Sequence, residues 1–126
     1  MALPWGVRAE LTAEQKANLP PAAAHKVSFS EEIYPLLEQS CTKCHGKGKA
    51  KGGFSLETRE QLLVGGETGA WVGVGNSAGS YLVELISGID LDNVMPQKGS
   101  KFTPEQVGLV RAWIDQGLQW EEGANF

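Results

Sequence analysis

Residues 33–46 read IYPLLEQSCTKCHG, and this stretch decides the fold. Its second half, Cys41-Thr42-Lys43-Cys44-His45, holds both cysteines of the chain, three positions apart, with a histidine directly behind them. A disulfide between two cysteines this close would cross-link only a few residues of a chain of 126, so a disulfide framework is excluded. The stretch is therefore either a dithiol redox pair or the site of a metal or cofactor.

The pattern C-x-x-C-H is the attachment sequence of haem c. Two thiols at this spacing can add to the two vinyl groups of one haem, and the next histidine is then held against the iron. We therefore expect one covalent haem on Cys41 and Cys44, with His45 as the iron ligand. A structural zinc site needs four ligands, and the chain has no further cysteine and only His25 as a second histidine. A thioredoxin-like pair expects a βαβ setting, which the sequence lacks.

Met95 is the candidate for the sixth iron ligand, because electron carriers of this kind pair histidine with methionine. It lies in Asn93-Val94-Met95-Pro96-Gln97, just before the last expected helix, and the other methionine is Met1. A loop can carry a thioether over the opposite haem face. The alternative is that Met95 fills a core gap, although its setting is not a helical core face. His25 is a weaker candidate because it lies in a linker.

The residues before the motif predict a helix. The apolar residues Phe29, Ile33, Leu36 and Leu37 recur at helical spacing. Ser28 with Glu31 resembles a capping box. Pro35 interrupts this run, so the helix is kinked or starts late.

Further helices are expected over residues 11–19, 58–64, 81–87 and 103–117. The last has the clearest signals: Thr103 as N-cap, Pro104 at the first position, Gln106 completing a capping box and Gly117 at the end. No segment alternates with period two, so we predict an all-α fold of four or so short helices around one haem. Residues 1–26 are predicted to be an N-terminal arm or linker, and residues 27–126 the folded domain.

In this order of elements the chain resembles class I cytochrome c, and more closely the planctomycete-type cytochrome c domain, over about residues 29–120. The resemblance implies one c-type haem, ligation by His45 and Met95, and a bacterial protein exported across the inner membrane. It rests on seven stretches of sequence: IYPLL (33–37), CTKCHG (41–46), KGGFSL (51–56), LLVGG (62–66), SYL (80–82), VMP (94–96) and VRAWID (110–115).

Haem propionates need hydrogen-bond donors. Arg59 is the preferred candidate, because arginine holds carboxylates with paired donors, and the indole of Trp71 is another. The alternative is that Arg59 lies exposed on a short helix. Trp113 is expected to pack the C-terminal helix against the first helix.

The charge pattern bears on partners. The net charge is −4, which makes nucleic acid an unfavourable partner. Lys43, Lys47, Lys49 and Lys51 nevertheless fall within nine residues, with no acid between Glu38 and Glu57. One interpretation is a solvated loop; the sharper one is a basic collar that steers acidic redox proteins to the haem edge.

The expected function is single-electron transfer, without catalysis. The alternative is a haem enzyme or sensor, peroxidase-like or gas-binding, with a labile sixth ligand. No apolar run is long enough to cross a bilayer, so we expect membrane association only through an anchor or parent protein outside this sequence. No signal peptide is visible at Met1-Ala2-Leu3-Pro4-Trp5. An exported, periplasmic chain is expected here either in its mature form or trimmed, with a new Met1.

Overall fold

The computed structural model describes residues 11–40, 58–65, 71–89 and 102–120. Within these ranges the regular structure is helical, without strands, which agrees with the all-α prediction. The α-helices are α1 (Ala13–Ala17), α2 (Tyr34–Ser40), α4 (Arg59–Val64), α5 (Tyr81–Ser87) and α6 (Pro104–Asp115). A π-helical turn, η1 (Phe29–Ile33), leads into α2, and a 3-10 turn, η3 (Ser77–Gly79), leads into α5.

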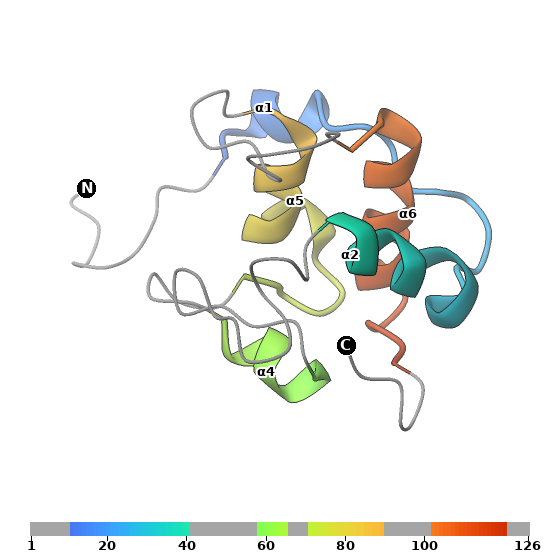
Figure 1. The fold of residues 1–126 in the computed structure, drawn as a ribbon. Coiled ribbons are helices and arrows are strands. Elements are labelled where there is room, and N and C mark those ends of the chain that lie inside the picture. Colours follow the sequence, from blue (N-terminus) through green and yellow to red (C-terminus); the bar gives the residue numbers. More distant parts are fainter. Residues whose placement is uncertain (1–10, 41–57, 66–70, 90–101, 121–126) are drawn as a thin grey trace.

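Helix α6 is the centre of the described fold. It contacts η1, η3 and α5, whereas α1 and α4 lie at opposite ends of the view in Figure 1. Its buried face comprises Val107, Val110, Trp113 and Ile114, as its helical spacing predicts. These side chains join one core with Ile33 and Leu37 of η1 and α2, Leu62 of α4, and Val83 and Ile86 of α5.

The ends of α6 follow the predicted capping. The Thr103 hydroxyl accepts a hydrogen bond from the Gln106 backbone N–H, and the Gln106 side-chain oxygen accepts one from the Thr103 N–H. At the other end Gly117 has φ 105°. Its N–H donates to the Ile114 carbonyl at 3.2 Å, and the Leu118 N–H donates to the Trp113 carbonyl at 2.9 Å. Both bonds together form the Schellman arrangement, which closes the helix.

Pro35 changes the helix before the motif. A proline inside an α-helix lacks an N–H and its ring crowds the carbonyl four residues back. Here the preceding turn is widened, so that the N–H groups of Ile33 and Tyr34 donate to the carbonyls five residues back, those of Ser28 and Phe29. The expected kink is therefore realised as a π-turn.

The same turn corrects the expected capping box. The Ser28 hydroxyl accepts from the Glu31 N–H at 3.3 Å, as predicted. The carboxylate that accepts a hydrogen bond from the Ser28 N–H is that of Glu32, at 3.0 Å. We attribute this shift by one residue to the extra residue in the wide turn.

Residues 20–27, here called the strap, are bound along α6. The Arg111 guanidinium donates to the Pro20 carbonyl at 2.7 Å, and the Ala23 N–H donates to the Gly108 carbonyl at 3.0 Å. The Gln116 amide donates to the His25 carbonyl at 2.8 Å and accepts from the Val27 N–H at 2.9 Å. The division into an arm and a domain at residue 26 stays a prediction, but this part of the arm is fastened to the C-terminal helix.

Candidate cofactor site

The residues predicted to bind the cofactor divide into two groups. Cys41, Cys44, His45 and Met95 lie outside the described residues, as do the lysines of the proposed basic collar. Arg59 and Trp71 are described. The structure therefore bears on the elements that flank the attachment motif and on the two candidate propionate donors.

Helix α2 ends at Ser40, directly before Cys41, and follows directly on η1, which contacts the C-terminal helix. The ring of Phe29 stacks on Trp113 of α6, with centroids 5.8 Å apart and planes at 27°. Trp113 is fully buried, and its indole N–H donates to the Gln119 carbonyl at 2.7 Å. The expectation that Trp113 packs the last helix against the helix before the motif is confirmed. The attachment motif therefore begins at the end of a helical segment whose start is packed in the core.

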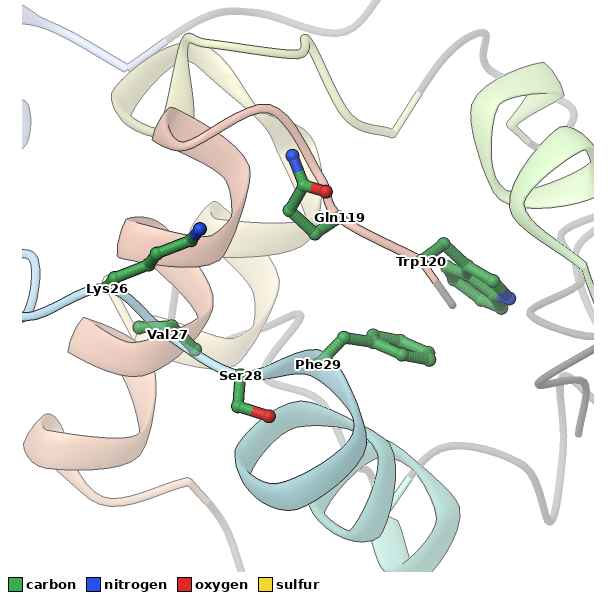
Figure 2. A pocket seen from close by; sticks show the side chains of 6 residues that line it. All are labelled: Lys26, Val27, Ser28, Phe29, Gln119 and Trp120. Atoms are coloured by element: carbon green, nitrogen blue, oxygen red, sulfur yellow. The ribbon is translucent and has the colours of Figure 1, made fainter. Parts of the chain in front are cut away.

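A second ring extends this aromatic contact toward the surface. Trp120 stacks on Phe29 at a centroid distance of 4.6 Å, as the two adjacent side chains in Figure 2 show. These two residues line an open pocket of about 370 Å³ together with Lys26, Val27, Ser28 and Gln119. Of the two predicted site residues that the structure describes, neither Arg59 nor Trp71 lines it. A second open pocket, of about 520 Å³, lies between the strap and the first half of α6 and includes His25 and Glu105.

Arg59 lies at the first position of α4 and is partly buried. Its Nε donates to the Leu118 carbonyl at 3.1 Å and its Nη2 is 3.5 Å from the Gly117 carbonyl. Both carbonyls follow the C-terminal end of α6, where the helix dipole favours a cation. Arg59 is thus not the exposed arginine of the alternative interpretation. Guanidinium has five N–H donors, so these two bonds are compatible with a propionate contact, which stays a prediction.

Trp71 is buried, with 7% of its surface exposed. Its ring packs edge-on against Tyr81 at 5.3 Å, and its carbonyl accepts a hydrogen bond from the Leu82 N–H at 2.9 Å. The indole nitrogen is shielded from solvent. Trp71 therefore fixes the start of α5, and its role toward a propionate likewise stays a prediction.

His25 pairs with a carboxylate. Its Nε2 lies 2.8 Å from Oε2 of Glu32. The pKa of the Glu32 carboxyl is held below its usual value, mainly by the hydrogen bond from the Ser28 backbone N–H and to a smaller extent by the hydrogen bond with His25. Within the described ranges, no group of three or more His, Cys, Asp and Glu side chains forms a cluster that could hold a metal ion.

One polar network was not foreseen from the sequence. The Ser77 hydroxyl donates to Asp115 at 2.8 Å and accepts from Nε of Arg111 at 3.1 Å. In the sequence, Arg111 and Asp115 stood out only as members of VRAWID (110–115), one of the stretches that resemble the cytochrome c family. Their spacing of four on one helix was the available local signal, but nothing nearby indicated Ser77 or Pro20 as partners.

The donor set of the chain fits haem c. Two thiols with x-x spacing suit the two vinyl groups, and an imidazole and a thioether are axial ligands known for haem iron in cytochromes c. Cys41, Cys44, His45 and Met95 supply these groups, and the helix before Cys41 is anchored.

Comparison with known proteins agrees with this donor set. Residues 41–99 match the family model described as planctomycete cytochrome C. The match contains all six predicted site residues and confirms the predicted resemblance over this stretch. The curated proteins and the solved structures contain no match.

Proposed function

We propose that this protein is a single-electron carrier with one covalent haem c, because residues 41–99 match the family model described as planctomycete cytochrome C. Cytochrome c domains in general serve haem-based electron transfer. The haem iron, when bound, supplies the reversible change between the ferrous and ferric states. The observation that carries the proposal is that one family match spans both the C-x-x-C-H motif and Met95.

The side chains of the motif have distinct roles. Each thiol, of Cys41 and of Cys44, would add across one vinyl group: a sulfur–carbon bond forms and the thiol hydrogen moves to the terminal vinyl carbon, so the step needs no oxidant. The His45 imidazole would ligate the iron from the proximal side. The Met95 thioether would take the sixth position, and the donors Arg59 and Trp71 are proposed for the propionates.

Covalent attachment is tested by intact mass in denaturant. The mass should equal the polypeptide plus one haem. Acid acetone that extracts the haem and leaves bare polypeptide would contradict the proposal.

Ligation by Met95 separates an electron carrier from a haem enzyme or sensor with a labile sixth position. The ferric protein should show the weak far-red band of sulfur-to-iron ligation. Met95→Ala should abolish the band and lower the midpoint potential, because a thioether favours ferrous iron. An unchanged band and potential in the variant would exclude this ligand.

The class I fold and an exported location belong to the same proposal. Cytochrome c domains are usually exported, and the contact of the helix before the motif with the last helix supports a closed shell around the cofactor. No described helix is long and apolar enough to cross a membrane. Expression in bacteria without an export signal should yield haem-free chain, and abundant holoprotein from the cytoplasm would argue against maturation outside it.

We further propose that the basic collar docks acidic redox partners. Reversing Lys47, Lys49 and Lys51 to Glu should slow electron transfer to an acidic acceptor, most at low salt, because exposed charges act over about 8–10 Å at physiological salt. Lys26→Glu, at an exposed position of the strap, is the control for charge reversal elsewhere. A triple variant with the wild-type rate and salt dependence would show that the loop is merely solvated.

A further inference from the structure

Residues 25–28, where the strap ends and η1 begins, are bound by the side chain at the end of α6. Gln116, the C-cap of that helix, donates from Nε2 to the His25 carbonyl at 2.8 Å. Its Oε1 accepts from the Val27 N–H at 2.9 Å. An amide side chain can make both bonds because it carries a donor and an acceptor. Gln116 therefore holds the backbone on both sides of Lys26.

The same four residues are also bound by a side chain of η1. Oε1 of Glu32 accepts from the Ser28 N–H at 3.0 Å, and Oε2 lies 2.8 Å from Nε2 of His25. The His25 and Glu32 side chains are 56% and 29% exposed, so their ion pair contributes little by itself. Gln116 and Glu32 thus bind one short segment although they belong to different elements.

Apolar side chains fix the position of this segment in the core. Val27 and Phe29 are 3% and 2% exposed, and the Phe29 ring stacks on Trp113 of α6. Between them, the N–H groups of Val27 and of its neighbour Ser28 are held by Gln116 and Glu32 respectively. Because neighbouring residues share a rigid peptide plane, a displacement at one of these N–H groups moves the other.

We propose that Gln116 and Glu32 form a two-sided lock on residues 25–28, which couples the end of α6 to η1. Since η1 runs directly into α2, and α2 ends at Ser40, the lock holds the base of the helical segment that precedes the attachment motif. The lock goes beyond the proposed electron transfer and does not depend on it, because none of its residues is proposed to bind the haem.

Gln119 provides a matched control for Gln116. It lies three residues further along, at an exposed position, and accepts the Trp113 indole N–H with its backbone carbonyl. It also lines the same open pocket as Val27. Gln119→Met therefore makes the same chemical change next to the lock without removing either of its bonds.

The lock is tested by amide hydrogen exchange, followed by NMR in the holoproteins of the wild type and the variants. Three amides report on it. The Val27 N–H is bound by Gln116, the Ser28 N–H by Glu32, and the Ile33 N–H donates to the Ser28 carbonyl within η1. The Ile33 amide is the decisive reporter, because its own bond involves neither lock side chain.

Gln116→Met should raise the exchange rates of all three amides by about fivefold, because the lost hydrogen bonds stabilise the segment as a unit. Glu32→Met should raise the same three rates. Gln116→Glu keeps the acceptor for the Val27 N–H but loses the donor, so its rates should lie between those of Gln116→Met and the wild type. Gln119→Met should exchange like the wild type.

The amide of Val110, inside α6 and fully buried, separates the lock from general stability and should keep the wild-type rate in every variant. The proposal is overturned if Gln116→Met accelerates Val27 alone, because the two sides then act separately. It is also overturned if Val110 is accelerated equally, or if Gln119→Met has the same effect. If Gln116→Met does not fold, the same comparison of Val27 with Ile33 in Gln116→Glu decides.

Discussion

Replacing Gly108 by alanine tests whether the strap presses on α6. Alanine usually stabilises a helix interior relative to glycine by about 0.5–1 kcal/mol. At this position, however, an added Cβ would lie 2.5 Å from the Pro21 carbonyl oxygen, which is backbone and cannot rotate away. The strap must move, and the bond from the Ala23 N–H to the Gly108 carbonyl, 3.0 Å long, is weakened or lost. Overpacking of this kind costs about 1–3 kcal/mol, and the lost hydrogen bond about 1 kcal/mol more.

The net effect of Gly108→Ala should therefore be a destabilisation of about 1–3 kcal/mol. With a urea dependence of about 2 kcal/mol per molar, the unfolding midpoint of the holoprotein falls by about 0.5–1.5 M. Gly73→Ala is the control, because the nearest atom to its added Cβ is 3.8 Å away and the change should stay within about 0.5 kcal/mol. If Gly108→Ala is as stable as the wild type or more stable, helix propensity dominates and the strap does not constrain this position.

Three further changes probe the cap, the acid response and the aromatic anchor. Thr103→Ala removes the N-cap of α6 and should cost about 1 kcal/mol in urea unfolding; no loss would mean that the cap is redundant. The pKa of Glu32 is lowered in the fold, by the Ser28 N–H and then by His25, so its contribution is complete above the unfolded pKa and is lost as pH falls through the folded one. From about pH 5 toward pH 3 the wild type should thus lose more stability than Glu32→Gln, and parallel pH profiles would refute this. Trp113→Ala, which empties a fully buried site, should cost about 3–5 kcal/mol in the same assay, and a smaller loss would mean that the core collapses into the space.

Local sequence signals predicted the helix ends well. Thr103 with Gln106, and Gly117 after the last turn, act on backbone groups within three or four residues, so their effect does not depend on the rest of the fold. Ser28 shows the limit of such signals. Its return partner is Glu32 rather than Glu31 because Pro35, further along the chain, widens the turn between them.

The fastening of the strap could not be predicted. Its partners on and directly after α6 lie 85–91 positions away in the sequence. No pattern in the residues around Gln116 or Gly108 indicates that they bind the strap. The same holds for Arg59, whose charge suggested an anionic partner but whose observed acceptors are carbonyls at the end of another helix. The candidate site was predicted from the C-x-x-C-H spacing and, for Met95, from its loop setting before the last helix, and the family match covers both.

The π-turn at Phe29–Ile33 sets the rotational phase of the helix that leads to the first cysteine. Each residue turns an α-helix by about 100°. The wide turn accommodates one residue more than an α-helical turn, and with it Ile33 and Leu37 both point into the core, fully buried. Cys41 follows Leu37 at the same interval of four. Deleting one residue from positions 30–32 would keep the helix but rotate everything after it relative to α6, so that the attachment motif would start from the wrong side of the helix. The number of residues in this turn thus determines which side of the helix faces the core. Substitutions within the turn should therefore be tolerated far better than an insertion or a deletion.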